Sequence, residues 1–396
     1  MASLLLASAL GLGLGAPLGQ AEDSELAARL DPILERAVAE QRIVGTVVMV
    51  ARQGRLVYHR AVGFADREAG QAMREDQLFR FASLTKPLVA VTALRLADQG
   101  RLDLQVPVSR YLPYFSTRLA DGTPAVPTLT QLLSHTSGLH YGFSEDADGP
   151  YHRAGVSDGL DGAPLTLDEN LRRLPRVPLD FPPGSHWRYS LGLDVLGGAL
   201  EAATGLPLPE VVSREVATPL GLHDLSFQVT EPGRLATAYR DGYPRPEPMS
   251  EPYRLPMPTG GILYSPARAF AANAFPSGGA GMQGSAGDYL TFLEGVRQGL
   301  LLSPASQRLF VEDQIPQLQR EDAPGWGFSL GAAVLRDARE AKTPQTPGTL
   351  QWGGVYGNAW FIDPARGLSV VILTNTAIAG MSGPFPDAIR DALYAE

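Results

Sequence analysis

The chain has 396 residues, 44% of them hydrophobic and 19% charged, which is enough to bury a large core and typical of roughly two or three lobes. Its formal net charge is −9 and it contains no run of basic residues, so it lacks the charge pattern of a nucleic-acid-binding protein. The absence of cysteine excludes disulfides, thiolate metal sites and a cysteine nucleophile.

The N-terminal stretch of residues 4–15 is apolar but only about a dozen residues long, whereas roughly 20 are needed to span a bilayer. We therefore expect no membrane span here. Small residues and two acidic residues follow it, which resembles an export cleavage site and predicts a signal peptide over residues 1–21. The pattern is incomplete because no Lys or Arg precedes Arg29. We expect a periplasmic or secreted protein, and a cytoplasmic one if this leader does not function.

Hydrophobic periodicity predicts the elements that follow the leader. Apolar residues at helical spacing over residues 26–37 predict an amphipathic helix. Residues 46–52 and 55–62 are rich in valine and apolar residues and are separated by a Gln-Gly turn, which predicts a β-hairpin. Residues 83–100 predict a helix with Ser83 at its N-terminus and a glycine at its end.

The middle of the chain, residues 101–259, is rich in Pro and Gly and is broken by helical pieces such as residues 193–204. Residues 349–362 and 368–375 then predict strands, and residues 385–394 predict a final helix. Because strands occupy both ends of the chain, we expect an α/β (α+β) fold in which one mainly antiparallel sheet is flanked by helices and joined to a helical lobe. The predicted domains are an α/β sheet domain (residues 22–85 and 260–396) and a helical, loop-rich domain (residues 86–259).

Ser83-Leu84-Thr85-Lys86 is an SxxK arrangement, and positions three apart on a helix share a face, so the ammonium can approach the hydroxyl. Serine is a poor nucleophile unless a neighbouring group takes its proton. The same pattern also arises where an N-capping serine precedes a surface lysine. Lys86 is one of only two lysines in the chain, and an apolar run follows it, which favours a lysine with a specific role.

Two further segments could contribute to a site. Residues 181–190 form a Pro- and Gly-containing loop that carries Tyr189 and precedes the helix expected near residue 193. A lone tyrosine in such a loop is more often a packing residue whose hydroxyl is hydrogen-bonded. Trp352-Gly353-Gly354-Val355 lies on a predicted strand, where glycines allow a ligand to approach the backbone closely, although glycine in a strand more often marks a bulge.

Taken together, in this order and spacing, these segments resemble the serine β-lactamase and penicillin-binding protein superfamily over nearly the whole chain. Supporting segments are Leu-Leu-Ser-His-Thr-Ser-Gly-Leu at residues 132–139, Ser-Gly-Gly-Ala-Gly-Met at residues 277–282 and Leu-Thr-Asn-Thr at residues 373–376. The details are most similar to the family VIII carboxylesterases, in which SxxK and the tyrosine are kept and Trp-Gly-Gly occupies the strand.

The resemblance implies a β-lactamase/transpeptidase-like fold and assigns roles to individual residues. Ser83 is the expected nucleophile, and Tyr189 with Lys86 takes its proton, although which of the two is the base stays open. The N–H groups of Ser83 and Val355 are expected to form the oxyanion hole. The resemblance implies no cofactor or metal. Residues expected to contact substrate are Trp352, Gly353, Gly354, Tyr141, Trp187 and Leu191.

Two departures from the β-lactamase pattern bear on the substrate. Leu191 stands where those enzymes have an asparagine, and leucine cannot hydrogen-bond a substrate amide. Trp352 stands where they place a cation. Losing both groups disfavours an anionic amide more than a neutral ester. We therefore expect a serine carboxylesterase that hydrolyses short-chain esters through an acyl-enzyme, with a class C-like β-lactamase or D-Ala-D-Ala carboxypeptidase as one alternative and a non-catalytic cell-envelope binding protein as another.

A competing motif for a nucleophile occurs at residues 155–159, where Gly-Val-Ser-Asp-Gly matches the GxSxG pattern of α/β-hydrolases. That pattern requires a buried strand before the serine and a helix after it, and the flanking residues here are polar and loop-like. The last histidine, His223, also comes too early for the usual chain order of such enzymes. The other histidines show no paired-ligand spacing, so we expect no metal site.

Overall fold

The computed structural model describes residues 18–395. Most of the predicted signal peptide lies outside the described residues, and residues 18–21 belong to helix α1, so the leader and the localisation stay predictions. No helix within the described part of the chain is both long and apolar enough to cross a membrane.

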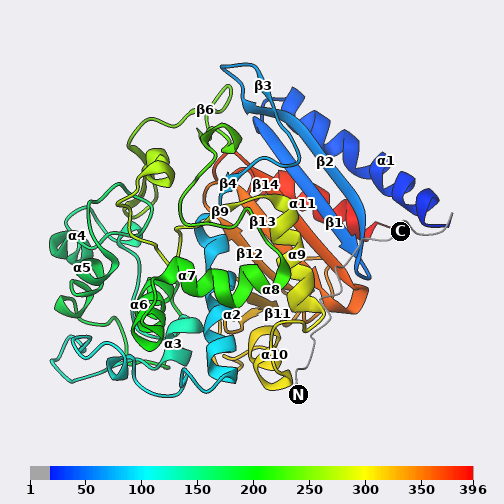
Figure 1. The fold of residues 1–396 in the computed structure, drawn as a ribbon. Coiled ribbons are helices and arrows are strands. Elements are labelled where there is room, and N and C mark those ends of the chain that lie inside the picture. The colour runs from blue at the N-terminus through cyan, green and yellow to red at the C-terminus, as the bar shows by residue number, and fades with distance from the viewer. Residues whose placement is uncertain (1–17, 396) are drawn as a thin grey trace, which may run out of the picture.

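The centre of the fold is one eight-stranded sheet (Figure 1). Strands from both ends of the chain meet in its middle, where β1 pairs with β14 in antiparallel register, with Val47 opposite Leu373. This is the predicted α/β architecture with a mainly antiparallel sheet. In sheet order the strands are β10 (Trp326–Phe328), β11 (Ala333–Leu335), β12 (Leu350–Gly354), β13 (Asn358–Asp363), β14 (Leu368–Thr374), β1 (Gly45–Arg52), β2 (Arg55–Asp66) and β3 (Gln71–Ala72).

Of two strand predictions, one is confirmed by the structure and the other is divided by a turn. The hairpin expected over residues 46–62 is present as β1 and β2. Residues 349–362 do not form one strand, because a tight turn at residues 355–357 separates β12 from β13. Gly357 makes that turn possible, since its φ of 109° is strongly disfavoured for any residue with a side chain. Short two-stranded pairs are β4 (Phe79–Arg80) with β9 (Gln283–Gly284), β5 (Tyr239–Arg240) with β6 (Glu247–Pro248), and β7 (Tyr253–Pro256) with β8 (Gly261–Tyr264).

Helices cover both faces of the sheet, because alternate residues of its central strands point to opposite sides. Val48 and Val50 of β1 join a core with α1 (Leu18–Ala39) and α11 (Pro384–Tyr394), as the periodicity of both helices predicts. Val47 and Met49 join the core on the other face, where α2 (Thr85–Asp98) and α9 (Ala286–Arg297) pack. Helix α10 (Pro304–Val311) contacts α2 at the end of this layer.

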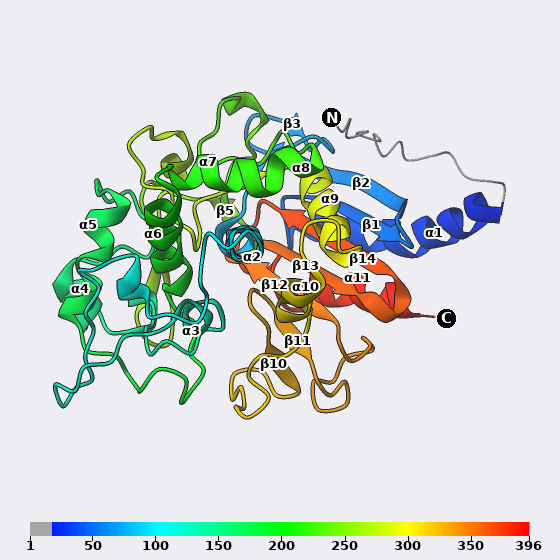
Figure 2. The same ribbon diagram turned by 60° about the horizontal axis from the view of Figure 1, so that its bottom comes forward.

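The middle of the chain forms a helical, loop-rich lobe beside the sheet, with α2 between them (Figure 2). The helix predicted over residues 193–204 is present as α6 (Gly192–Thr204). A single hydrophobic cluster runs from the sheet through α2 into α6, so the two parts share a core. The proposed domain limits stay predictions. The other helices of the lobe are α3 (Leu129–Leu133), α4 (Pro150–Ala154), α5 (Leu167–Leu171), α7 (Leu208–Val212) and α8 (Thr218–Leu220), the last two joined by a π-helical turn (Ser213–Ala217).

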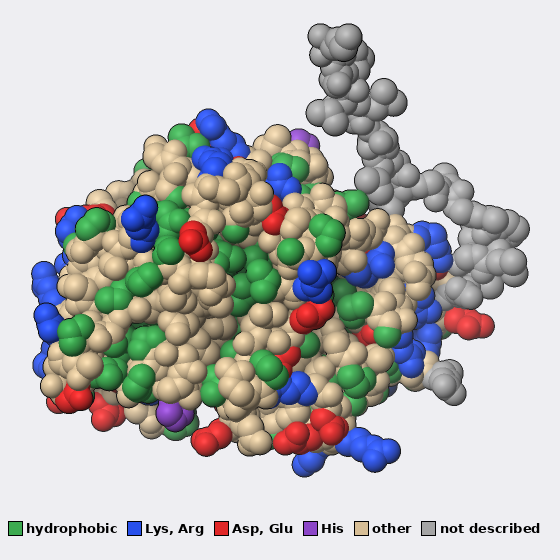
Figure 3. All heavy atoms as spheres, turned by 90° about the horizontal axis from the view of Figure 1, so that it is seen from below, with side chains coloured by type: hydrophobic (Ala, Val, Ile, Leu, Met, Phe, Trp, Pro, Cys, Tyr) green, Lys and Arg blue, Asp and Glu red, His purple; other side chains and the backbone are tan. Residues whose placement is uncertain are grey.

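The molecular surface carries both signs of charge. On the face seen from below in Figure 3, hydrophobic side chains gather towards the middle, and many of the acidic and basic side chains lie around the rim.

Candidate active site

Ser83 lies in a 3₁₀ turn (Ala82–Leu84) that leads directly into α2, so the α-helix begins at Thr85 rather than at Ser83 as predicted. The preceding residue, Ala82, is buried and has a φ of 46°, which is a costly conformation for a residue with a Cβ atom. The start of the turn is fixed by a hydrogen bond, because the Phe81 N–H donates to the Met282 carbonyl at 2.9 Å. A strained backbone held in this way is typical of functional sites.

Lys86 occupies the first turn of α2 and is only 1% exposed, which excludes the alternative of a surface lysine. Its Nζ donates to the Gly279 carbonyl at 2.7 Å and to Ser83 Oγ at 3.3 Å. Gly279 belongs to the 277–282 segment that the sequence singled out. Any Cβ at Gly279 would lie 2.5 Å from a carboxylate oxygen of Asp194 and 3.4 Å from Lys86 Nζ, so glycine is required there.

Tyr189 reaches the same serine from the lobe. Its hydroxyl lies 2.5 Å from Ser83 Oγ. Lys86 Nζ lies 4.6 Å from the centroid of the Tyr189 ring, within cation–π distance. The structure thus brings the three residues of the predicted catalytic group together at one oxygen atom, although they come from two separate segments.

His135 holds the loop that carries Tyr189. The Arg188 N–H donates to the His135 carbonyl at 2.9 Å, and the Ser190 N–H donates to His135 Nδ1 at 3.3 Å. The imidazole packs against the Tyr189 ring with centroids 4.8 Å apart. Burial lowers the pKa of His135 well below its usual range, and the Lys86 charge adds to this, so the ring is neutral. Residues 132–139 were recognised as a motif, but the sequence alone did not show that its histidine supports Tyr189.

The glycines of the Trp-Gly-Gly segment allow close packing around β12, a role that was not part of the prediction. A Cβ at Gly354 would lie 2.2 Å from the Phe81 carbonyl oxygen, so glycine lets β12 approach the turn that carries Ser83. A Cβ at Gly353 would instead meet the Met381 side chain at 2.5 Å. Val355 follows the last paired residue of β12, and its carbonyl accepts a hydrogen bond from the Tyr264 hydroxyl at 3.0 Å.

A cavity of about 660 Å³ opens beside Ser83. Its wall is mostly apolar and contains Trp352, as the resemblance implied. It also contains Arg320, a cation that no sequence argument placed here. Residues of this wall include Ser83, Tyr189, Trp352, Gly353, Val355, Phe143, Met257, Ile262, Trp326, Met381 and Arg320.

Of the six residues expected to contact substrate, Trp352 and Gly353 lie in the wall of this cavity, whereas Gly354, Leu191, Tyr141 and Trp187 are not among its lining residues. Leu191 is fully buried in the hydrophobic core at the start of α6. Tyr141 is 2% exposed and packs behind Tyr189, with ring centroids 5.1 Å apart. Trp187 packs against Phe328 and Arg320 and supports the wall from outside. Burial opposes direct substrate contact for Leu191 and Tyr141. For Trp187 and Gly354, substrate contact stays a prediction.

The competing serine of the GxSxG match is not arranged for catalysis. Ser157 is 2% exposed, and its hydroxyl donates to the Asp161 carboxylate at 2.6 Å. Within residues 18–395, no group of three or more His, Asp or Glu side chains is placed to hold a metal ion.

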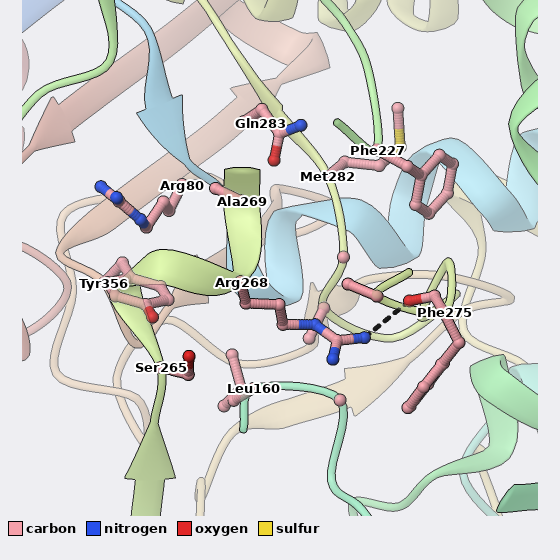
Figure 4. A pocket seen from close by; sticks show the side chains of 14 residues that line it. Arg80, Leu160, Phe227, Ser265, Arg268, Ala269, Phe275, Met282, Gln283 and Tyr356 are labelled. Carbon is pink, nitrogen blue, oxygen red and sulfur yellow. Dashed lines mark hydrogen bonds between the residues drawn. The ribbon is translucent and has the colours of Figure 1, made fainter. Parts of the chain in front are cut away.

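A second, much smaller cavity of about 20 Å³, roughly the space of one water molecule, is lined by residues that include Arg80, Arg268 and Tyr356 (Figure 4). Arg268 donates from Nη2 to the Phe275 carbonyl at 2.6 Å beside it. None of Ser83, Lys86 and Tyr189 lines this cavity. The chemistry of the molecule is therefore concentrated in the larger cavity.

Comparison with known families agrees with this geometry. Residues 30–393 match the family model described as Beta-lactamase. The chain belongs to the beta-lactamase family. The superfamily resemblance that the motifs carried is confirmed, and so is the fold class.

Individual members of the family with high similarity to this chain include an esterase and a hydrolase. Esterase EstB from Burkholderia gladioli is 52% identical over 94% of this chain and 96% of its own length. The structure of EstCE1, titled a hydrolase with promiscuous acyltransferase activity, superposes with a TM-score of 0.91 at 47% identity and covers 95% of this chain and 100% of its own. Simvastatin synthase LovD from Aspergillus terreus, at 24% identity and a TM-score of 0.72, shares the fold over 98% of both chains.

Proposed function

We propose that this protein is a serine carboxylesterase that hydrolyses short-chain carboxylic esters through an acyl-enzyme on Ser83. The observation that carries the proposal is the meeting of two proton-accepting or proton-donating groups at one hydroxyl: Lys86 Nζ at 3.3 Å and the Tyr189 hydroxyl at 2.5 Å from Ser83 Oγ. Similarity to Esterase EstB over nearly the whole chain supports ester hydrolysis rather than another reaction of this fold.

In the acylation step, Ser83 Oγ attacks the ester carbonyl while its proton passes to the Tyr189–Lys86 pair. The Lys86 charge over the Tyr189 ring favours any negative charge that develops on the phenol oxygen. The C–O bond of the tetrahedral intermediate then breaks, and the pair returns the proton to the leaving alcohol. In the second half, water gives a proton to the same pair and attacks the acyl carbonyl. The bond between the acyl carbon and Ser83 Oγ then breaks, the pair returns the proton to Ser83 Oγ, and the acid is released.

Negative charge on the carbonyl oxygen is held by the N–H groups of Ser83 and Val355. Support for Val355 comes from its place just past the β12–β13 ladder and in the wall of the cavity beside Ser83. Two backbone donors fixed by a strained turn and a strand end do not need to reorganise during the reaction, which is what makes such a hole effective.

The decisive experiment compares hydrolysis of p-nitrophenyl acetate, butyrate and octanoate with that of nitrocefin. Ser83→Ala should lower ester turnover by about 10³-fold or more. Ser157→Ala, the matched serine of the competing motif, should keep it. Survival of turnover in Ser83→Ala would mean that the nucleophile is wrong. Faster turnover of nitrocefin than of any ester would favour the β-lactamase alternative, and failure of serine-reactive phosphonates to label the protein would favour a non-catalytic one.

A further inference from the structure

Arg320 is a buried cation in the wall of the cavity beside Ser83. It belongs to the loop between α10 and β10 and is 7% exposed. Its guanidinium lies 4.1 Å from the ring centroid of Trp187 and 5.8 Å from that of Trp352. The two indoles therefore hold the guanidinium in place without neutralising its charge.

The charge of Arg320 is only partly balanced by the protein. Asp322 accepts hydrogen bonds from Nε at 3.3 Å and from Nη2 at 2.7 Å. Within residues 18–395, Nη1 has no acceptor. The Asp322 side chain is 54% exposed, so solvent screens its charge. Its carboxylate therefore neutralises little of the charge of the buried guanidinium. Arg336 lies near enough to add further positive potential.

Another arginine in the cavity wall, Arg390 of α11, differs from Arg320 in how its charge is balanced. Its guanidinium contacts two carboxylates, Asp387 and Asp391, both at 2.8 Å. Its side chain is 22% exposed, whereas that of Arg320 is 5% exposed. Arg390 therefore has its charge balanced within its own helix, and Arg320 is the cation of this wall that can take another anion.

A continuous aromatic path leads from Arg320 to the nucleophile. Trp352 contacts Arg320 on one side and packs against the Tyr189 ring on the other, with those ring centroids 5.3 Å apart. The Tyr189 hydroxyl contacts Ser83. A substrate lying along Trp352 can therefore place an ester at Ser83 and a second group at Arg320.

We propose that Arg320 is a specificity-determining residue that binds a carboxylate carried by the substrate, while the ester of the same substrate reacts at Ser83. This inference rests on the proposed esterase function. A guanidinium with a free Nη1 and a displaceable, exposed partner can pair with a carboxylate through two parallel hydrogen bonds. The inference goes beyond the expectation of a neutral ester, because Arg320 places a cation in the cavity wall although position 352 has none.

The test compares charged and neutral esters of equal size. One pair differs in the acyl group: the monoadipate and the hexanoate of p-nitrophenol. Another pair differs in the leaving group: 3-carboxyphenyl and 3-carbamoylphenyl butyrate. The quantity measured is the ratio of kcat/KM for the anionic ester to that for its neutral partner.

Arg320→Met should lower this ratio by about 10- to 100-fold in at least one pair, because a hydrogen-bonded charge is lost. Arg320→Lys should retain part of the preference for the anionic ester, since lysine keeps the positive charge but cannot form the two parallel hydrogen bonds of a guanidinium. Asp322→Asn removes the competing carboxylate from an exposed position and should raise the ratio. Arg390→Met is the matched control and should leave the ratio unchanged.

The outcomes separate this inference from the esterase function. An unchanged ratio in both pairs for Arg320→Met, or a proportional fall for both members of each pair, would overturn the role of Arg320 while leaving the esterase function intact. If Arg320→Met does not fold, Asp322→Asn decides, and a ratio that fails to rise would overturn the proposal. If no ester is hydrolysed in a Ser83-dependent manner, the esterase function and this inference fail together.

Discussion

Gly354→Ala is the substitution that most directly tests how β12 is placed against the nucleophile. The added Cβ would lie 2.2 Å from the Phe81 carbonyl oxygen and 3.1 Å from Leu84 Cδ1. Ordinary contact begins near 3.4 Å, so β12 and the Ser83 turn must separate by about 1 Å. Backbone atoms on both sides form this contact, so no side chain can relieve it by turning away.

The expected consequence is larger for catalysis than for folding. Overpacking of this kind costs about 1–3 kcal/mol of the free energy of unfolding. A displacement of about 1 Å between catalytic groups costs about 10²-fold in rate. In the mechanism that we propose, the displaced donor is the Val355 N–H, which acts on the charge of the transition state, so we expect the loss in kcat rather than in KM.

The matched control is the neighbouring Gly353→Ala. Its Cβ would meet the Met381 side chain at 2.5 Å, with the nearest backbone atom, the Asn358 carbonyl oxygen, at 3.4 Å. A methionine side chain is flexible and can move aside. Steady-state hydrolysis of p-nitrophenyl butyrate and urea unfolding should be measured for both variants. Equal kcat values for the two alanine variants would refute the oxyanion role given to Val355.

Two further substitutions test the surroundings of the site. Tyr264→Phe removes the hydroxyl that donates to the Val355 carbonyl, which should cost about 1 kcal/mol of stability and lower kcat, whereas Tyr394→Phe, which removes a buried hydroxyl on α11, should affect stability alone. Equal kcat values for both would contradict this. Burial raises the pKa of Asp158 to about 7, although the Gly142 and Phe143 N–H groups favour its charged form. The folded state therefore holds this proton more tightly than the unfolded chain, and the stability it contributes is lost as pH rises through 7. Between pH 5.5 and 8.5 the wild-type protein should lose up to about 2 kcal/mol that Asp158→Asn does not lose, as measured by urea unfolding. A parallel pH dependence in both proteins would contradict the assignment.

The sheet and its flanking helices could be predicted because their signals are local. Valine-rich runs around Val47 and Val371 alternate between two covered faces, and the helices near each end carry one apolar stripe. The turn that divides β12 from β13 was missed, since Trp-Gly-Gly-Val looks like continuous strand until Gly357 adopts a positive φ. Turn geometry depends on one residue, whereas periodicity depends on many.

Lys86 was the part of the site that the sequence predicted best. Its rarity in an arginine-rich chain and the apolar run after it pointed to burial, and the side chain is 1% exposed. The burial of Tyr141 and Leu191 was not foreseen, because proximity in sequence to a motif does not say which way a side chain faces. His135 and Arg320 act through contacts with residues far away in the chain, so no local pattern could assign them.

The way in which four residues from different parts of the fold meet at the site explains why the molecule needs both the sheet and the lobe. Ser83 and Lys86 belong to the start of α2, Tyr189 comes from the lobe, and Val355 comes from the sheet. Helix α2 packs within the one hydrophobic cluster that spans sheet and lobe. Any change in how the lobe sits on α2 would move the Tyr189 hydroxyl from its 2.5 Å contact with Ser83 Oγ. The continuous core therefore keeps the site geometry fixed, and the strain at Ala82 can persist because the packing around it determines the turn.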